Sequence, residues 1–338
     1  MGCSVIVGGH FGDEGKGKII SYLALKDKPA VVARSGVGPN AGHTVEYKGL
    51  SYKLRMLPSG FIAEKARILI GPGVLVNPAV LFSELEVTKI YDRLGVDAHC
   101  AVIEPKHIEM DKQDSYLSGK VGTTGTGCGP TNVDRVKRIS KLAQEIPELS
   151  RYITDVPSEV NEALDKGETV LIEGTQGTFI SLYHFYSWPY CTSKDVCASA
   201  ACSDVGVGPT KIDDVYVVFK SYTTRVGGGP LPNEISEEEA KKRGWFEMGT
   251  VTGRKRRASP FNFDLARRAV MLNGATQVAL TKLDVVFPGA KGVKTYAKLP
   301  EDAKKFIIEV EDYVKAPVTL LGVGPSAEEI IDLRSEKL

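Results

Sequence analysis

The sequence lacks several features that mark whole classes of protein. It has no run of about 18 consecutive apolar residues, so we expect no membrane-spanning helix. The stretch from Met1 to Gly9, before the first polar loop, is too short for a secretory signal peptide. Lys and Arg number 43 against 42 Asp and Glu, so neither nucleic acid nor a membrane surface is expected as a partner.

Cysteine is also scarce. The six cysteines form no CxxC pair and are too few for a disulfide framework, so we expect mostly buried, reduced thiols and a cytoplasmic location. The five histidines show no metal-ligand spacing such as HxxxH. Hydrophobic residues make up 42% of the chain and charged residues 25%, which is the usual balance of a globular protein. A chain of 338 residues is long enough to bury a large core.

Short β-branched runs alternate with helical patterns, which favours an α/β fold. Strands are predicted at residues 4–7, 30–34, 68–70, 169–172, 215–219, 277–281 and 318–321. No repeat or linker divides the chain. We therefore predict a single domain over residues 1–338, with a P-loop-like nucleotide-binding fold whose central, mostly parallel sheet is flanked by helices. Peripheral excursions are expected at about 95–165 and 230–260.

Capping signals predict where several helices begin and end. Asn77 followed by Pro78 marks a helix start, and Gly95 marks the end of that helix. Signals of the same kind predict further starts at Ser236, Asn262 and Ser326.

A glycine-rich loop at residues 8–18 is the strongest local pattern, since it follows a predicted strand and opens a helix. Glycines let backbone N–H groups approach phosphate oxygens, and the helix N-terminus adds positive potential. Residues 12–18 fit GxxxxGK, but Ile19 replaces the Ser or Thr that would hold magnesium. Asp13 is therefore interpreted as a cation ligand or a base. The alternative is a tight turn with exposed charges.

Two patterns near the C-terminal end suggest a base pocket. Residues 281–284, TKLD, follow an apolar strand, and an Asp there can accept hydrogen bonds from guanine N1 and N2 while the Lys lies over the ring. Adenine has no such donor pair, so the pattern favours GTP over ATP. By itself, however, TKLD is also typical of an ordinary strand end. Residues 322–325 are interpreted either as a wall of this pocket or as a turn from strand to helix.

Further loops combine small residues with hydroxyls or cations. In residues 38–44, the imidazole of His43 can donate to a phosphoryl oxygen. Residues 122–130 lead into a helix with Arg135 and Arg138 predicted on one face, which suits a phosphomonoester but equally a flexible loop before a solvated helix. The other three histidines outside the glycine loops are interpreted as structural: His99, His107 and His184.

Three more loops complete the set. In residues 173–178 the amide of Gln176 can read a carbonyl and a ring nitrogen, and residues 189–193 supply hydroxyls. Residues 249–257 place four consecutive cations after glycines and hydroxyls, which suits a small dicarboxylate. A nucleic-acid patch is the alternative, but aromatic residues are not interleaved there.

Taken together these motifs resemble the adenylosuccinate synthetase family. The resemblance is carried by GDEGKGK at 12–18, NAGHT at 40–44, TTGxGxGP at 123–130, EGxQGT at 173–178, TRVGGGP at 224–230, TGRxRR at 252–257 and TKLD at 281–284. It implies a GTP-dependent ligase that joins aspartate to inosine monophosphate (IMP) through a 6-phosphoryl intermediate in AMP synthesis. A regulatory GTP-binding switch is the alternative, and a ligase with a related substrate is another.

The resemblance also implies roles for individual residues. Catalysis would involve Asp13 as base, His43 as acid, Lys16 and Gln176, with Mg²⁺ held by Asp13 and Gly42. GTP would be bound by Gly12, Asp13, Glu14, Gly15, Lys16, Gly17, Lys18, Gly42, His43, Thr44, Arg256, Lys282, Leu283, Asp284, Gly322, Val323 and Gly324. IMP would be bound by Asp13, Lys16, Asn40, Ala41, Gly42, His43, Thr124, Arg138, Gln176, Thr192 and Arg254. Aspartate would be bound by Thr250, Val251, Thr252, Gly253, Arg254 and Arg256. Arg138 would reach IMP from the partner subunit of a homodimer.

The chain departs from the family pattern in a few places. It is shorter than typical members, which predicts trimmed peripheral helices between Thr124 and Gln176 and between Asp284 and Gly322. Thr126 stands where an arginine is usual, and Lys194 replaces a small polar residue.

Overall fold

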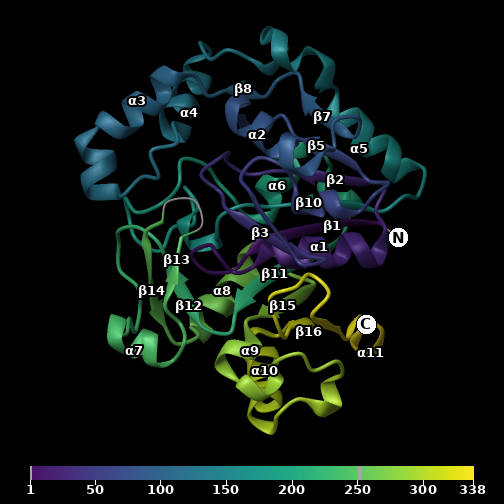
Figure 1. Ribbon diagram of the computed structural model, residues 1–338, viewed down its shortest axis with the longest axis vertical. Coiled ribbons are helices and arrows are strands. Elements are labelled where there is room, and N and C mark those ends of the chain that lie inside the picture. The colour runs from purple at the N-terminus through teal and green to yellow at the C-terminus, as the bar shows by residue number, and fades with distance from the viewer. Residues whose placement is uncertain (1, 250–252) are drawn as a thin grey trace.

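A ten-stranded sheet runs through the centre of the protein (Figure 1), as seen in a computed structural model that describes residues 2–249 and 253–338. The strand order is β17-β16-β15-β11-β1-β10-β2-β5-β7-β9, and every neighbouring pair is parallel except β16 with β17. In chain order the strands are β1 Cys3–Gly8, β2 Val31–Arg34, β5 Arg67–Ile70, β7 Leu94–Asp97, β9 Ile153–Thr154, β10 Val170–Glu173, β11 Ile212–Lys220, β15 Gln277–Thr281, β16 Val318–Gly322 and β17 Ile330–Asp332. The predicted α/β fold with a mostly parallel sheet is confirmed.

Helices cover both faces of this sheet, because its central strands are apolar on both sides. Along β1, Val5 and Val7 pack into one buried cluster while Ile6, between them, packs into the other. One face is covered by α5 Val156–Asp165, α6 Ala198–Val205, α8 Phe263–Asn273 and α10 Glu301–Val314. The other is covered by α1 Lys16–Asp27 and α2 Pro78–Thr88.

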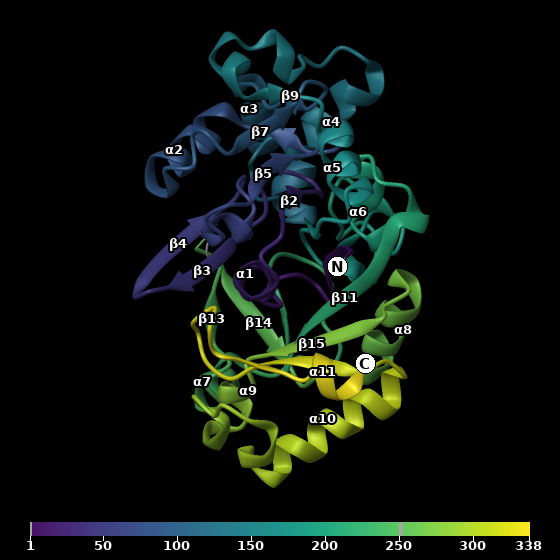
Figure 2. The ribbon, with the colours of Figure 1, turned by 90° about the vertical axis from the view of Figure 1, so that its right-hand side faces the viewer.

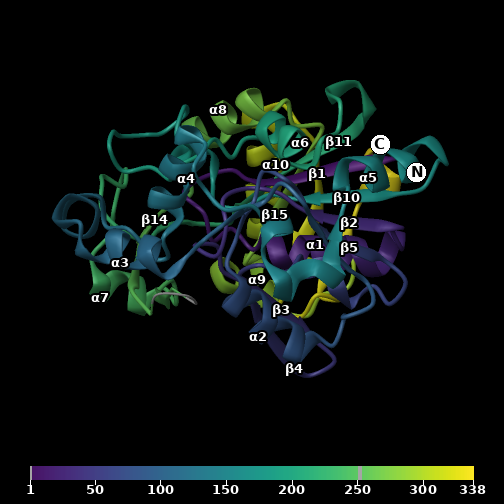
Figure 3. The ribbon, with the colours of Figure 1, turned by 90° about the horizontal axis from the view of Figure 1, so that it is seen from above.

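Two smaller assemblies stand on the same side of the sheet (Figures 1 and 3). One contains α3 Pro105–Gln113 and α4 Cys128–Lys137. The other contains β12 Thr223–Arg225, β13 Glu247–Met248, β14 Lys255–Ser259 and α7 Glu237–Lys242. Figure 2 shows the hairpin of β3 His43–Tyr47 and β4 Leu50–Leu54 projecting from the sheet on the side away from α6. The remaining short elements are β6 Leu75–Val76, β8 Ala101–Val102, α9 Leu283–Val286 and α11 Arg334–Lys337.

Three predicted helix starts are confirmed. The side chains of Asn77, Ser236 and Asn262 each accept a hydrogen bond from the backbone N–H three residues on, at 3.2, 3.1 and 3.0 Å. Across the described part of the chain, no helix combines the length and the apolarity needed to cross a bilayer.

Two capping predictions are wrong. Helix α2 ends at Thr88, with Lys89 in the left-handed conformation at φ 55°, whereas Gly95 lies within strand β7. Ser326 begins no helix. Its backbone N–H donates to the Glu329 carboxylate at 2.8 Å in a turn that leads into strand β17.

Candidate functional site

Four parallel strands of the central sheet end in polar residues. Strand β2 ends at Arg34, β10 at Glu173, β11 at Lys220 and β15 at Thr281. The carboxyl ends of parallel strands meet at one edge of a sheet, and ligands of open α/β sheets bind outside that edge. A cavity of about 480 Å³ lies there.

The cavity gathers residues from loops that are far apart in the sequence. Predicted site residues that line it are Gly12, Asp13, Gly15, Lys16, Gly17, Lys18, Asn40, Ala41, Gly42, His43, Thr44, Thr124, Gln176, Thr192, Arg254, Arg256, Lys282 and Gly324. Predicted site residues that are described but do not line it are Glu14, Arg138, Gly253, Leu283, Asp284, Gly322 and Val323. The predicted aspartate-binding residues Thr250, Val251 and Thr252 lie outside the described residues.

The glycine-rich phosphate loop is held in shape by a carboxylate within it. Gly12 and Asp13 adopt positive φ angles of 91° and 62°, which turn the chain sharply before α1. The buried Glu14 carboxylate accepts from the N–H of Gly12 at 2.7 Å and from the ammonium of Lys16 at 2.8 Å. Burial opposes ionisation of Glu14, but Lys16 keeps its pKa below the usual value. Glu14 therefore shapes the loop instead of facing the cavity.

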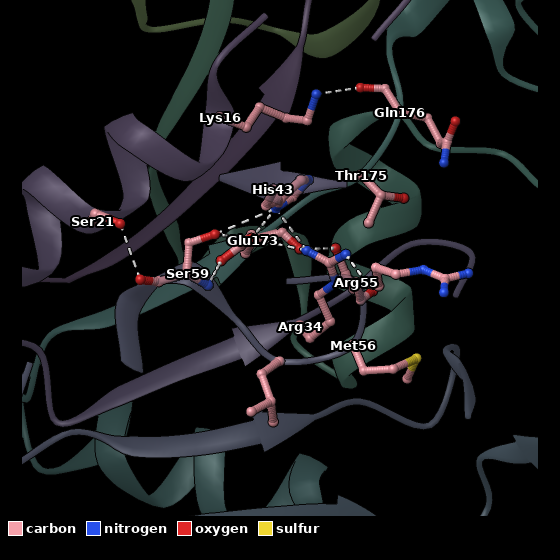
Figure 4. Close-up of polar contacts among 12 residues, drawn as sticks. Lys16, Ser21, Arg34, His43, Arg55, Met56, Ser59, Glu173, Thr175 and Gln176 are labelled. Atoms are coloured by element: carbon pink, nitrogen blue, oxygen red, sulfur yellow. Dashed lines mark hydrogen bonds and ion pairs between the residues drawn. The ribbon is translucent and has the colours of Figure 1, made fainter. Parts of the chain in front are cut away.

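The loop after β10 lies directly against the phosphate loop. A Cβ atom at Gly177 would stand 2.3 Å from the backbone nitrogen of Gly12, so a side chain there would force the two loops apart. The neighbouring Gln176 accepts from the Lys16 ammonium through its backbone oxygen, while its side chain lines the cavity (Figure 4). The packing therefore fixes Gln176 beside Lys16.

His43 rests on a buried ion pair. Its Nδ1 contacts the Glu173 carboxylate and lies 2.9 Å from Nη1 of Arg34, which in turn donates to Glu173 at 2.8 Å (Figure 4). Ser59 adds two hydrogen bonds to the same carboxylate, from its N–H at 2.6 Å and its hydroxyl at 2.9 Å. Burial, helped by the positive charge of Arg34, lowers the pKa of His43 to about 4. The ring is therefore neutral near pH 7.

A second cluster of charges surrounds Asp13. Nε of Arg256 lies 2.9 Å from Oδ2 of Asp13, and Nη1 of Arg256 contacts the Glu247 carboxylate. Lys220, at the end of β11, lies 3.0 Å from Glu247. Burial opposes ionisation of Glu247, but Lys220 and Arg256 hold its pKa well below the usual range. Arg256 is thus fixed between two carboxylates and positioned over the phosphate loop.

The opposite wall of the cavity carries polar groups that suit a nucleotide. Oδ1 of Asn40 is buried and has no hydrogen-bond partner among the described residues, while its Nδ2 lies 3.4 Å from the Thr192 hydroxyl. Nη1 of Arg254 donates to the Gly122 carbonyl at 2.9 Å, which fixes this arginine against the loop that contains Thr124. A buried acceptor with no protein partner points to a ligand donor.

The two departures from the family pattern have structural explanations. The Thr126 hydroxyl lies 3.0 Å from that of Thr124 and is buried. The Lys194 ammonium pairs with Asp204 and donates to the Gly73 carbonyl at 2.6 Å. Asp204 also accepts from the N–H of Gly36 at 2.8 Å. Lys194 therefore ties three loops together behind the cavity.

At the far end, the phosphate helix is joined to the C-terminal loop. The Lys18 ammonium donates to the carbonyls of Gly324 and Glu329, the latter at 2.9 Å, and burial lowers its pKa to about 8. Residues 322–325 lead into strand β17, so the strand-to-helix turn considered from the sequence is not formed. Nearby, Oδ1 of Asp284 is buried and without a partner in the described chain.

Arg138 is placed differently from the prediction. It lies one residue beyond the end of α4, in the left-handed conformation at φ 64°, and is exposed. It therefore does not share a helical face with Arg135. The cavity of its own chain is not lined by Arg138.

Comparison with known proteins decides the family. The family model described as adenylosuccinate synthetase matches residues 5–148 and 139–291. The adenylosuccinate synthetases of Archaeoglobus fulgidus and Methanosphaera stadtmanae are 57% and 54% identical to this chain, and each alignment covers all of both proteins. The chain belongs to the adenylosuccinate synthetase family. A solved structure of the fully ligated adenylosuccinate synthetase of Plasmodium falciparum matches with a TM-score of 0.90 at 26% identity, over 97% of this chain and 99% of that one.

Membership of the adenylosuccinate synthetase family assigns the activity. The protein is a GTP-dependent ligase that joins aspartate to IMP and gives adenylosuccinate, GDP and phosphate in AMP biosynthesis. The regulatory GTP-binding switch that the sequence left open finds no support in these comparisons.

Sequence reasoning missed the charged residues that support the site. The residues concerned are Arg34, Lys220 and Glu247, which lie in none of the motifs recognised in the sequence, although the first two end apolar strands. A charged residue in last position on a buried parallel strand is a usable signal, because its side chain must find a partner at the carboxyl edge.

Proposed function

We propose that Asp13 is the base that removes the N1 proton of IMP. The observation that carries this proposal is the position of its carboxylate. It lines the substrate cavity from within the phosphate loop and forms an ion pair with Arg256. A base there stands next to the place where the γ-phosphate of GTP would lie, so geometry meets the first requirement for general-base catalysis.

The reaction then needs two steps. Loss of the N1 proton to Asp13 moves negative charge onto O6, which attacks the γ-phosphorus of GTP. The bond to the bridging oxygen breaks and GDP leaves. The aspartate amine next attacks C6 of the 6-phosphoryl intermediate, the C6–O6 bond breaks and phosphate departs. The proton lost by the amine and the proton held by Asp13 both pass to water. The first step turns a poor oxo leaving group into a good one.

Lys16 and His43 would stabilise the charge that develops in the first step. Both line the cavity and both are buried, in surroundings where electrostatic stabilisation is strong. A phosphoryl anion beside Nε2 of His43 favours the protonated ring, because an adjacent negative charge raises the pKa of an imidazole. Glu173, at Nδ1, would hold that imidazolium in position.

Magnesium fits the oxygen atoms at the base of the loop. Asp13 offers a carboxylate and Gly42 a backbone carbonyl, the hard donors that this ion prefers, and both residues line the cavity. When bound, Mg²⁺ would neutralise charge on the phosphate oxygens during transfer. Asp13 and Gly42 are the residues proposed to hold it.

The substrates would occupy three parts of the cavity. GTP would extend from the phosphate loop towards Lys282 and Asp284, beside the loop of residues 322–324. IMP would lie against the wall that carries Asn40, Thr124, Gln176, Thr192 and Arg254. Aspartate would be bound by residues 250–254 with Arg256. The buried Oδ1 atoms of Asn40 and Asp284, which have no hydrogen-bond partner among the described residues, support this placement, because ligand N–H groups would satisfy them.

Arg138 would act across a homodimer. It is exposed, does not line the cavity of its own chain, and follows a helix whose Val133 and Val136 are 51% and 76% exposed. Apolar side chains exposed next to a cation suit a surface that a second copy covers. Arg138 would then contact the IMP phosphate of the partner.

Mixing inactive subunits tests the base and the dimer together. Asp13→Asn is expected to abolish turnover, and Arg138→Ala to lower kcat/KM for IMP by about 10- to 100-fold. Equal amounts of the two variants, unfolded and refolded together, should form heterodimers as half of all dimers. In each heterodimer one of the two sites combines an intact Asp13 with an intact Arg138, so about a quarter of wild-type activity should return. Lys137→Ala, next in the chain and exposed, is the matched control and should keep full activity. No gain on mixing would contradict the shared site.

We also propose a single domain with excursions at about 95–165 and 230–260, in a cytoplasmic setting. The strands of the central sheet come from both ends of the chain, and each excursion contributes residues to one cavity, such as Thr124 and Arg254. All six cysteines are free thiols, which agrees with a reducing compartment.

A further inference from the structure

Three side chains that can ligate a metal meet outside the substrate cavity. They are His184, Asp195 and Cys197, and one ligand atom of each lies within 4.8 Å of the other two. None of the three lines the cavity or belongs to a motif that was assigned a role. These three residues could not be predicted as a group, because their spacing matches no metal-binding pattern.

The backbone brings the three together without help from a ligand. The N–H of Leu182 donates to the Lys194 carbonyl at 3.1 Å, which pairs the two ends of the loop that separates His184 from Asp195. Cys197 is the N-cap residue of α6, so its position is fixed by that helix. A site whose ligands are already close loses little chain entropy when an ion binds.

The Asp195 carboxylate is oriented by its neighbours. Its Oδ1 accepts from the Val196 N–H at 2.8 Å and from the Ser181 hydroxyl. The hydrogen bonds that Asp195 accepts from the Ser181 hydroxyl and from the N–H groups of Val196 and Cys197 all end on Oδ1. Oδ1 therefore has the outer partners that orient a metal-bound carboxylate.

We propose that His184, Asp195 and Cys197 form a zinc site. An imidazole nitrogen, a carboxylate oxygen and a thiolate are all established zinc ligands, and three protein ligands leave a fourth, tetrahedral position for water. Zinc bonds of about 2.0–2.3 Å would draw the three atoms closer by rotation of the side chains. Magnesium and calcium do not compete well here, since a thiolate is too soft a ligand for them.

Binding requires the thiol to lose its proton. A zinc ion replaces that proton, which passes to water, and then neutralises the charges of both the thiolate and the carboxylate. The site is therefore selective for ions that form strong bonds to sulfur.

The ion would connect His184 to the start of α6 and so close the loop of residues 184–197. That loop contains Thr192, which lines the substrate cavity. Zinc would therefore raise the thermal stability of the protein and fix the loop that carries Thr192.

Metal binding to the full-length protein tests the site. The protein is stripped with a chelator, then dialysed against buffered zinc with excess magnesium, and zinc per chain is measured. One zinc per chain is expected. Cobalt(II) in place of zinc should give a thiolate-to-cobalt charge-transfer band, a readout independent of catalysis.

Variants assign the ligands. Cys197→Ser should remove the cobalt band and weaken zinc binding more than about tenfold, since loss even of an outer partner typically costs 10- to 100-fold. Serine is a good N-cap residue, so this variant should fold. His184→Ala should weaken zinc binding similarly. The matched controls are Cys202→Ser, in the same helix, and His99→Ala, and both should bind as wild type does. Absence of stoichiometric zinc, or a cobalt band retained in Cys197→Ser, would overturn the proposal.

Discussion

Arg34 and Glu173 form a buried ion pair at 2.8 Å beneath His43, and the sheet itself creates it. The two residues are direct partners in the register of β2 with β10, and their side chains are 1% and 0% exposed. Two charges so deeply buried are tolerated because each is the partner of the other. His43 depends on this pair for its position.

Breaking the pair should cost both stability and activity. Glu173→Gln leaves the buried Arg34 guanidinium without the carboxylate it pairs with, so we expect the free energy of unfolding to fall by about 3–5 kcal/mol in urea titrations. Replacing both residues by methionine should recover at least half of that loss, because no unpaired charge remains. Turnover should stay low in the double variant, since His43 has lost its support. A double variant with wild-type turnover would show that the pair does not position His43.

Asp284 should determine the choice of base. Its buried Oδ1 has no partner among the described residues. Asp284→Asn is expected to raise the KM for GTP by about 10- to 100-fold, because a charge-assisted hydrogen bond to the ring is lost. The amide can donate to a 2-oxo group, so the variant should prefer xanthosine triphosphate. Asp302→Asn, at an exposed position of α10, is the control. If the ratio of kcat/KM for GTP and xanthosine triphosphate is the same in Asp284→Asn as in the wild type, Asp284 does not contact the base of GTP.

His10 should make the protein sensitive to mild acid. Its ring packs against Phe219 and Phe261, and burial lowers its pKa to about 4. The unfolded chain takes up this proton at about pH 6.5, whereas the folded protein does not until about pH 4. Stability therefore falls as the pH drops through this window, by about 1.4 kcal/mol per pH unit for each such histidine.

The contribution of His10 can be isolated by replacement. Between about pH 6 and pH 4.5, His10→Phe should reduce the slope of unfolding free energy against pH by about 1.4 kcal/mol per pH unit. Urea unfolding at several pH values measures this slope. Part of the slope should remain in this variant, because the pKa of His43 is also lowered by burial. His99→Gln is the control, since that ring is 70% exposed. A slope in His10→Phe equal to that of the wild type would contradict the assignment.

Much of the site could be predicted because its loops are local in sequence. Residues 12–18 follow β1 and run into α1, and residues 40–44 follow β2 and run into β3, so each motif is one short stretch that contains the information needed. The supporting contacts are not local. Arg34 and Glu173 are 139 residues apart, and only the pairing of two strands brings them together. Their partnership could not be predicted without the strand order.

The wrong capping predictions have the same physical origin. Gly95 is a good residue for a helix end, but its segment pairs with β5 as a strand, and Lys89 takes the left-handed position instead. The segment after Ser326 pairs with β16 as strand β17. In both cases burial in the sheet outweighs a local preference worth only about 1 kcal/mol.

The central claim is that Asp13 starts the reaction by taking the N1 proton of IMP. The most direct test uses GTP with a heavy-oxygen label in the β–γ bridge, incubated with IMP, magnesium and enzyme but no aspartate. Reversible phosphoryl transfer to O6 frees the β-phosphate of GDP to rotate, so the label moves to a non-bridging position. We predict that the wild type moves the label only when IMP is present, and that Asp13→Asn does not move it although GTP and IMP still bind. Label movement in Asp13→Asn at the wild-type rate would contradict the account.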